Sequence, residues 1–219
     1  KMRGLAKFPS VNPPKDFNGT LRPYQLEGLS WLQFLKESDL GGIMADDMGL
    51  GKTIQLLAHI CLIKEKGELA NPFLIVCPTS VLPNWIAEAR RFAPGLKVTS
   101  YTGPNRALNR KHFKDSDIVV TTYALVTRDL DFLKDHLWNC VVLDESQAIK
   151  NSQTILFDAV NQLKSVSRIC MTGTPMENHL GELWSQFHFI IPGMMGTKRE
   201  FNLKVRKPIE KESNDLVRR

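Results

Sequence analysis

The sequence predicts an α/β fold, with a mostly parallel central sheet covered by helices on both faces. Short apolar runs rich in β-branched residues recur along the chain, and longer stretches with the apolar spacing of helices separate them. Strands that alternate with helices pair in parallel, because each connection crosses over through a helix. The chain has 219 residues and is 42% hydrophobic, which favours one packed core over two ordinary domains.

The expected strands and helices alternate along most of the chain. The predicted strands are residues 41–45, 73–77, 117–122, 140–144 and 168–172. The predicted helices are residues 25–36, 52–66, 81–92, 154–163 and 179–190. Ligands of such sheets bind at the carboxyl ends of the strands. The segments that follow the strands are therefore the first places to search for a functional site.

The two ends of the chain differ in composition from the middle. Residues 1–20 are rich in proline and are expected to form an irregular arm before the folded lobe, residues 21–197. Residues 198–219 hold eight Lys or Arg against four Asp or Glu, so four of the chain's six net positive charges lie there. This segment is interpreted as a severed basic connector toward a second lobe. Net charge alone therefore gives only weak support for nucleic-acid binding.

Cysteine usage and apolar run length predict an intracellular protein that does not cross a membrane. Cys61, Cys77, Cys140 and Cys170 lie singly inside apolar runs, with no C-x-x-C pair. This pattern is typical of small buried residues in a reducing compartment and argues against disulfides and zinc. The longest apolar runs have only the length of a strand, and the first residues, KMRG, lack the apolar stretch of a signal peptide.

The stretch ADDMGLGKT, residues 45–53, matches a phosphate-binding loop placed between a strand and a helix. Gly49 and Gly51 would let the backbone approach phosphate oxygens, and the N–H groups at the start of the helix would face the anion. Lys52 would place its charge on the β and γ phosphates, and Thr53 would place its hydroxyl on magnesium. The alternative is a glycine turn that only joins the strand to the helix.

An aspartate, Asp46, stands where phosphate-binding loops have their first glycine. A carboxylate aimed at a triphosphate would be repelled, so the side chains of Asp46 and Asp47 are expected to turn away, toward loop N–H groups or a nearby cation. Residues 48–53 would then form the cradle. Met48 and Leu50 are therefore candidate nucleotide contacts as well. Asp47, which directly precedes the cradle, is counted with them.

Two adjacent acids, Asp144 and Glu145, end a predicted buried strand. Acids in such a place are costly unless they serve chemistry: the first can hold magnesium through its waters, and the second can orient or deprotonate an attacking water. The alternative is a pair of acids that caps the strand at the surface. Gln147, Lys150 and Asn151 follow, and from the residues alone they are interpreted as an ordinary polar turn.

The last predicted strand opens into TGTPMEN, residues 172–178. Thr172 and Thr174 bracket Gly173, and their hydroxyls either belong to an ordinary loop or form a relay between the nucleotide and another surface. Asn178 is a candidate N-cap for the helix that follows. The apolar stripe of that helix predicts that it packs in the core, through Leu180, Leu183, Trp184, Phe187 and Ile191.

Taken together, these blocks resemble the first motor lobe of the SWI2/SNF2 family, a branch of helicase superfamily 2. The resemblance covers nearly the whole chain, from LRPYQLEGLSWL through ADDMGLGKTIQ, LIVCPTSVLPNW, DIVVTTY, LDESQAIKN and MTGTPMENHLGELWS to IIPG. It implies a RecA-like lobe and accounts for Asp46, because an acid commonly opens the phosphate loop in this family. One departure is Ser146 in DESQ, where Ala or Gly is more common, and little change is expected from it.

The resemblance implies a nucleotide-related role for each matched residue. Gln25 would read the adenine edge, and Gln147 would sense the γ-phosphate. Lys52 and Thr53 would bind phosphate and magnesium, and Asp144 and Glu145 would be the magnesium and water acids. Coupling of the nucleotide state to lobe movement would fall to Thr172, Gly173 and Thr174.

The resemblance also implies contacts with nucleic acid. Two segments would face the DNA backbone, where N–H and hydroxyl donors suit phosphate contact without sequence preference. They are Pro78, Thr79 and Ser80, and Thr121, Thr122 and Tyr123. Lys150 and Asn151 would lie near the DNA path.

The implied function is ATP-driven translocation on double-stranded DNA, which remodels protein–DNA complexes without separating the strands. ATP and Mg²⁺ are the implied cofactors, and the partners are duplex DNA, a second RecA-like lobe of the same parent chain and an unidentified protein target. That lobe would supply arginine fingers worth roughly a thousandfold or more in rate, so this fragment alone is expected to hydrolyse ATP poorly.

Two other functions stay open at this point. One is a strand-separating helicase or restriction-type translocase that shares the same lobe. The other is a switch, in which ATP only changes a binding surface. An intact Glu145 argues against the switch, because a pure switch does not need a water-activating acid.

Overall fold

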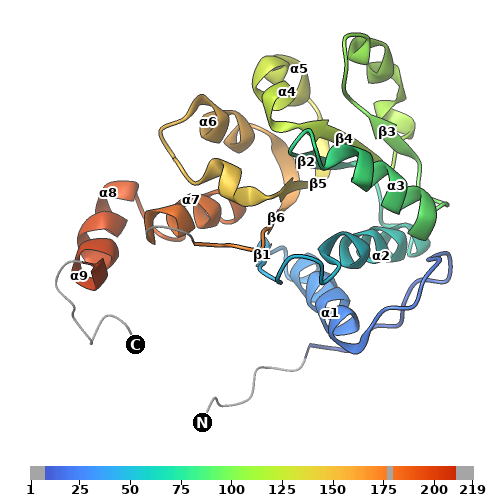
Figure 1. The fold of residues 1–219 in the computed structure, drawn as a ribbon, viewed down its shortest axis with the longest axis horizontal. Coiled ribbons are helices and arrows are strands. Elements are labelled where there is room, and N and C mark those ends of the chain that lie inside the picture. Colours follow the sequence, from blue (N-terminus) through green and yellow to red (C-terminus); the bar gives the residue numbers. More distant parts are fainter. Residues whose placement is uncertain (1–7, 177–179, 211–219) are drawn as a thin grey trace.

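The computed structural model describes residues 8–176 and 180–210. Its centre is a six-stranded sheet in the order β1-β6-β5-β2-β4-β3, and every neighbouring pair is parallel (Figure 1). The strands are β1 (Gly42–Met44), β2 (Phe73–Cys77), β3 (Val98–Ser100), β4 (Ile118–Thr122), β5 (Leu137–Asp144) and β6 (Lys164–Met171). The predicted α/β fold with a parallel sheet is confirmed.

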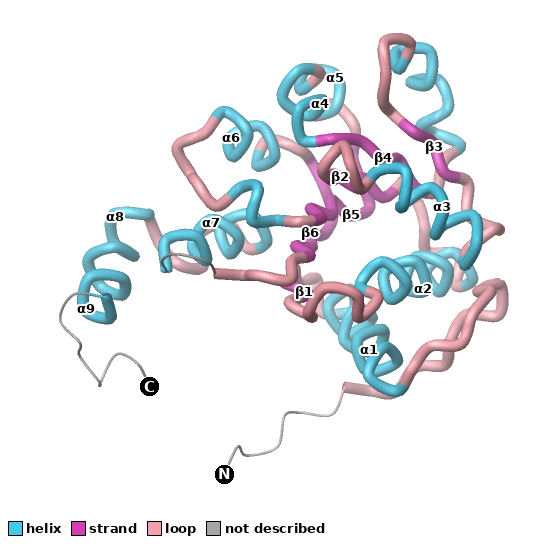
Figure 2. The backbone as a smooth tube through the Cα atoms, in the orientation of Figure 1, coloured by secondary structure: helices cyan, strands magenta, loops and turns pink. Residues whose placement is uncertain are grey.

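Helices connect the strands and surround the sheet, as Figure 2 shows. The α-helices are α1 (Pro23–Glu37), α2 (Lys52–Glu65), α3 (Leu82–Phe92), α4 (Tyr123–Arg128), α5 (Leu130–Leu133), α6 (Ile155–Asn161), α7 (Leu180–Ile190), α8 (Lys198–Phe201) and α9 (Lys207–Glu210). Other helical turns are η1 (Arg106–Asp115), η2 (Ser146–Ile149) and η3 (Asn202–Arg206). Among the described helices, none combines the length and apolar character needed to cross a bilayer.

The sheet separates two hydrophobic cores, one on each face. Neighbouring residues of a strand point to opposite faces, so Ile75 packs with α1, α2 and α3 while Leu74 packs with α4, α5, α6 and α7. Every residue of β2 and β4 is buried. Burial on both faces explains why these strands read as continuous apolar runs rather than as alternating ones.

The structure adds elements that the sequence pattern does not predict. β3 has only three residues, all partly exposed at the sheet edge, and is too short for a periodic signal. The turn η1 and the short helices α4 and α5 lie in stretches without a helical apolar repeat. They are stabilised by tertiary contacts instead: Phe113 of η1 and Leu133 of α5 both lie in the second core.

The described part of the N-terminal arm, residues 8–20, has neither helix nor strand, yet it packs on the lobe. Phe17 is buried in the first core, and the N–H of Asn18 donates to the carbonyl of Phe92 at 2.7 Å. At the other end, residues 198–210 are helical through α8, η3 and α9. The predicted N-cap Asn178 lies outside the described residues.

Candidate active site

The strand register brings the predicted loops to one edge of the sheet. Met171 of β6 pairs with Met44 of β1 and with Asp144 of β5, so these three strands end level. Cys77 of β2 pairs with Thr122 of β4, and β2 lies next to β5. We refer to the last residues of β1, β6 and β5, with the segments that follow them, as the β1-β6-β5 half of this edge. The last residues of β2 and β4, with the segments that follow them, form the β2-β4 half.

Two glycines give the loop after β1 its shape. Gly49 and Gly51 both have φ of 82°, a left-handed conformation that other residues rarely adopt. Gly51 is the N-cap of α2, and a Cβ there would lie 2.6 Å from Nε2 of Gln25. A Cβ on Gly49 would have no neighbour within 4 Å. The loop is therefore open at Gly49 and tightly packed at Gly51. Helix α2 begins at Lys52, so the N–H groups of its first turn lie at the loop.

The charged side chains of this loop bond within it and to α2. Nζ of Lys52 donates to the carbonyl oxygens of Asp46 at 2.7 Å and Asp47 at 3.2 Å, which places the ammonium inside the loop. Oδ2 of Asp46 accepts a hydrogen bond from Nε2 of Gln55 on α2 at 3.0 Å. The partner of the Asp46 carboxylate is therefore a side-chain amide rather than the loop N–H group or cation that was expected.

Gln25 packs against the same loop from α1. Its side chain is only 6% exposed; Nε2 donates to the carbonyl of Leu50 at 3.1 Å, and Oε1 accepts from the N–H of Arg22 at 2.9 Å. Tyr24 also donates its hydroxyl to the carbonyl of Leu50 at 3.1 Å. The amide is thus fixed beside the phosphate-binding loop, and its contact with an adenine stays a prediction.

The acid pair occupies the end of β5 and the residue after it. Asp144 is 6% exposed; Oδ2 accepts from Nε1 of Trp85 at 2.8 Å, and Oδ1 accepts from the N–H of Glu145 at 3.0 Å. Burial raises the pKa of the Asp144 carboxyl, against the opposing effects of the Trp85 hydrogen bond and the positive charge of Lys52. A bound cation would favour the ionised form, so this carboxylate suits a metal.

Glu145 has an unusual backbone conformation for a side chain of its kind. Its φ of 52° and ψ of 53° lie in the left-handed region, which costs about 1–2 kcal/mol for an L-residue other than glycine. Such strain persists only where the surroundings enforce it, and it is concentrated at functional sites. Here it turns the chain sharply from β5 into η2 and presents the Glu145 carboxylate at the edge.

A chain of hydrogen bonds connects Glu145 with the loop after β6. Nε2 of Gln147 donates to Oε2 of Glu145 at 2.7 Å, and Oγ1 of Thr172 donates to Oε1 of Gln147 at 2.8 Å. The N–H of Thr174 donates to Oγ1 of Thr172 at 3.0 Å. The hydroxyl of Thr172 therefore takes part in a hydrogen-bonded relay that Thr174 joins through its main-chain N–H group, and the connection of this relay to another surface stays a prediction.

The relay also touches the phosphate-binding loop. Gly173 lies so close to it that a Cβ would be 2.9 Å from Cγ of Met48 and 3.5 Å from its N atom. A side chain at this position would therefore require the exposed side chain of Met48 to move. The β1-β6-β5 half is therefore one connected unit, from the phosphate-binding loop through Gly173 and Gln147 to Glu145.

The residues of this half suit a nucleotide with magnesium. Mg²⁺ prefers oxygen ligands, keeps several waters and is commonly held by one or two protein groups together with phosphates. Asp144 and Thr53, the second residue of α2, provide a carboxylate and a hydroxyl for such a site. Within the described residues, no group of three or more His, Cys, Asp or Glu could hold a metal ion by itself.

The β2-β4 half differs from the expectation of a hydroxyl-lined surface. Thr79 and Ser80 are exposed and Pro78 is partly exposed, which leaves that segment available for a nucleic-acid contact. Thr121, Thr122 and Tyr123, however, are 0%, 4% and 9% exposed. Oγ1 of Thr121 donates to the carbonyl of Tyr101 at 3.0 Å. These three side chains are therefore buried in the lobe, and the expectation that this segment faces a DNA backbone stays a prediction.

Lys150 and Asn151 follow η2 on the other side of the acid pair. Lys150 is partly exposed, and its N–H donates to the carbonyl of Gln147 at 3.1 Å. Asn151 is exposed, and its Oδ1 accepts from the N–H of Gln153 at 3.0 Å. Both residues lie in the segment that continues from the acid pair, and their relation to nucleic acid stays a prediction.

Sequence reasoning missed two residues that hold the site together: Gln55, which contacts Asp46, and Trp85, which contacts Asp144. Each lies in a stretch whose spacing indicates only a helix. Tyr123 was named in a nucleic-acid segment, and the hydrogen bond from its hydroxyl to the carbonyl of Asp144, at 2.8 Å, was not expected. Buried Trp and Tyr side chains need a partner for their N–H or O–H group, which was the one signal available.

Comparison with known families and structures gives consistent matches. The SNF2-related domain matches residues 24–219. A Bacillus subtilis protein named as a putative ATP-dependent helicase/translocase, YwqA, is 43% identical over 218 residues, covering 98% of this chain and 24% of that protein. The human chromatin-remodeling ATPase INO80 is 38% identical, covering 94% of this chain and 14% of that protein. This chain therefore spans a quarter or less of these relatives.

A solved structure has the same fold. It is the Sulfolobus solfataricus SWI2/SNF2 ATPase core in complex with double-stranded DNA, which superposes with a TM-score of 0.89 at 42% identity. The match covers 96% of this chain and 43% of that chain. The likeness therefore includes the amino-acid sequence as well as the fold.

Proposed function

Because the chain belongs to the SNF2-related family, we propose that it is the ATP-binding lobe of an ATP-hydrolysing translocase that acts on double-stranded DNA and remodels protein–DNA complexes. The observation that carries this proposal is the connected β1-β6-β5 half. A phosphate-binding loop, a buried metal-type carboxylate and a second acid in a hydrogen-bonded relay meet at one strand edge. A binding module has no need of the second acid, whereas hydrolysis does.

The phosphate-binding loop would hold the triphosphate. Residues 48–53 would offer backbone N–H groups, with Asp47 at the entrance of the loop, and the N-terminus of α2 would face the phosphates. Lys52 would leave the carbonyls of Asp46 and Asp47 and bind the β and γ phosphates. Gln25, already fixed beside Leu50, would contact the adenine.

Asp144 and Thr53 would hold Mg²⁺, which, when bound, neutralises the charge that develops on the phosphates. Glu145 would orient an attacking water and accept its proton. Gln147 bonds Glu145 through its amide nitrogen and Thr172 through its amide oxygen, so a change at the γ-phosphate would reach Thr172 and Thr174 through it. Those threonines would pass the change to a second lobe.

Nucleic-acid contact would fall to the β2-β4 half. The exposed segment Pro78, Thr79 and Ser80 offers hydroxyl and N–H donors, which bind a DNA backbone without reading its sequence. Lys150 and Asn151 would extend the contact. The structural neighbour bound to double-stranded DNA supports duplex as the substrate.

The complete translocase would need a second RecA-like lobe. Arginines of that lobe would stabilise the charge of the transition state and raise the hydrolysis rate roughly a thousandfold or more. ATP hydrolysis by the lobe alone is therefore expected to be slow. The four free, buried cysteines are consistent with a protein that acts in a reducing compartment of the cell.

The test is ATP hydrolysis by the full-length protein at one fixed low salt, without nucleic acid and with duplex DNA, single-stranded DNA or RNA. Strong stimulation by duplex DNA alone is the expected result. Preference for single strands or RNA would instead indicate a strand-separating helicase. Hydrolysis that no nucleic acid stimulates would contradict the translocase and favour a nucleotide-dependent switch.

A further inference from the structure

Asp144 is held by groups from the opposite half of the edge, in addition to its own neighbour Glu145. The indole N–H of Trp85 donates to Oδ2, and the hydroxyl of Tyr123 donates to the main-chain carbonyl, both at 2.8 Å. Trp85 lies on α3, which follows β2, and Tyr123 is the first residue of α4, which follows β4. Asp144, the candidate metal ligand, is thus hydrogen-bonded to the segments that begin at Pro78 and Thr121.

The indole of Trp85 and the N–H group of Glu145 fix the orientation of the Asp144 carboxylate. Oδ1 is held by the N–H of Glu145 at 3.0 Å while Oδ2 is held by Trp85, so the plane of the carboxylate is set from both sides. Each carboxylate oxygen has about two acceptor positions, which leaves one on each for another partner. The arrangement therefore fixes the group without using up its capacity to bind a cation.

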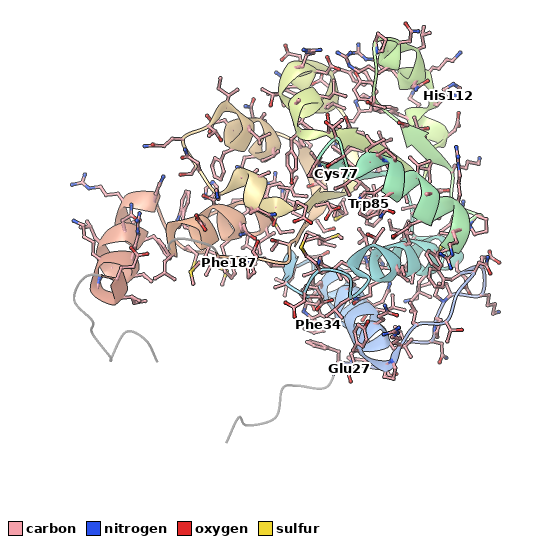
Figure 3. The ribbon with its side chains drawn as sticks, viewed as in Figure 1. Glu27, Phe34, Cys77, Trp85, His112 and Phe187 are labelled. Atoms are coloured by element: carbon pink, nitrogen blue, oxygen red, sulfur yellow. The ribbon has the colours of Figure 1, made fainter. Side chains whose placement is uncertain are left out.

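The Trp85 side chain is rigid enough for this task. It is 1% exposed and packs in the first core with the buried residues of α2 and the sheet. Figure 3 labels Trp85 on α3 and Cys77 on β2, and both residues lie in the first core. Hydrogen bonds to a charged group in a buried setting are roughly twice as strong as neutral ones, so this N–H restrains the carboxylate effectively.

A second buried tryptophan shows what an ordinary structural contact looks like in the same sheet. Trp138 is 0% exposed, and its Nε1 donates to the main-chain carbonyl of Leu133 at 3.1 Å. It lies at the start of β5, whereas Asp144 lies at the end of that strand. Both indoles satisfy a buried N–H group, but only the N–H of Trp85 is directed to a carboxylate of the candidate site.

We propose that Trp85 and Tyr123 are positioning residues for the magnesium-binding acid. Trp85 holds the carboxylate of Asp144 and Tyr123 holds its main chain, so that Asp144 meets the metal in one orientation. This inference rests on the proposed function, in which Asp144 binds Mg²⁺ together with a nucleotide. Partners that orient metal ligands typically contribute tenfold to a hundredfold in metal affinity.

The test is the binding of a fluorescent ATP analogue to the full-length protein, titrated with Mg²⁺ and repeated in a chelator. Trp85→Phe keeps an aromatic ring but loses the N–H group. It should raise the Mg²⁺ concentration for half-maximal binding about tenfold and leave binding in the chelator unchanged. Trp138→Phe is the matched control, because it removes an equally buried N–H group far from Asp144; the Mg²⁺ requirement should not change.

A second variant covers the case in which Trp85→Phe does not fold. Tyr123→Phe removes one oxygen atom and should raise the Mg²⁺ requirement about threefold, the effect of a hydrogen bond at the weak end of the usual range. Its control is Tyr101→Phe, since Tyr101 is also buried and donates its hydroxyl to Oδ2 of Asp129 at 2.9 Å. An unchanged Mg²⁺ requirement in the variants at 85 and 123, or an equal shift in the controls, would overturn the inference alone. If the unmutated protein showed no Mg²⁺-dependent binding, the proposed function would fail together with the inference.

Discussion

The two halves of the carboxyl edge use similar residues in different ways. Thr172 in the β1-β6-β5 half and Thr121 in the β2-β4 half are both 0% exposed. The hydroxyl of Thr172 bonds the side chain of Gln147 and so joins the relay to Glu145, whereas the hydroxyl of Thr121 bonds the main-chain carbonyl of Tyr101. Burial and residue type therefore do not identify site residues; the partner of each polar atom does.

The largest expected effect within this comparison comes from Glu145→Gln. The amide oxygen can still accept the hydrogen bond from Gln147, so the relay should keep its geometry. The variant loses the carboxylate that accepts the proton of water, and kcat for ATP should fall by roughly 10²–10⁴-fold while ATP affinity is retained. Single-turnover hydrolysis and equilibrium nucleotide binding measure the two quantities.

The control for that change is Asp158→Asn, which neutralises an exposed acid on α6 in the same way. It should behave as the unmutated protein. If Glu145→Gln hydrolysed ATP at the rate of the unmutated protein, Glu145 would have no part in the reaction. The β1-β6-β5 half would then lack the acid that distinguishes a hydrolytic site from a binding site.

A paired substitution sharpens the comparison directly. Thr172→Val and Thr121→Val each replace a buried hydroxyl by a methyl group of similar size and leave its hydrogen-bond partner unpaired. Each should lower the free energy of unfolding by about 1–3 kcal/mol. Only Thr172→Val should also lower kcat, by about tenfold, which corresponds to about 1.4 kcal/mol of lost transition-state stabilisation.

Chemical denaturation and ATP hydrolysis, measured on both valine variants, separate the two effects. Equal losses of stability with unequal losses of turnover are the expected pattern. If Thr121→Val lowered kcat as much as Thr172→Val, the division of the edge into two halves would be mistaken.

The smallest effect concerns the backbone strain at Glu145, where φ is 52°. Glycine adopts this conformation without a steric penalty, whereas alanine retains the penalty. Glu145→Gly should therefore be more stable than Glu145→Ala by up to about 1 kcal/mol, although the greater freedom of glycine in the unfolded chain offsets part of the gain. Thermal unfolding of the two variants tests this, and a less stable glycine variant would remove the evidence for strain.

Much of the fold and of the β1-β6-β5 half could be predicted from the sequence. Gly51, Lys52, Asp144 and Glu145 carry strong signals, because a Gly-Lys-Thr run between a strand and a helix, and paired acids at the end of a buried strand, are uncommon where no chemistry requires them. The parallel register then brings these segments to one edge. Local pattern and topology agree there, so the fold is confirmed and the roles of these residues stay predictions.

The burial of Thr121, Thr122 and Tyr123 in the β2-β4 half was not predicted, for a physical reason. A threonine at the end of a strand can point to either face or to solvent, and the sequence does not distinguish these outcomes for Thr121 and Thr122. The family resemblance implies a surface contact for Tyr123, but its hydroxyl bonds the carbonyl of Asp144 at 2.8 Å. That contact joins residues 21 positions apart in sequence through tertiary packing, and no local pattern encodes it.

The most direct test of this account compares two variants of the full-length protein at one fixed low salt: Lys52→Ala, and Thr79→Ala combined with Ser80→Ala. The affinities for ATP and for duplex DNA are measured on both. Lys52→Ala should weaken ATP binding about tenfold or more and leave duplex affinity unchanged. The double variant should weaken duplex binding by up to about tenfold and leave ATP affinity unchanged. Unchanged ATP affinity in Lys52→Ala, or equal losses of both affinities in both variants, would contradict the division of the edge into a nucleotide half and a nucleic-acid half.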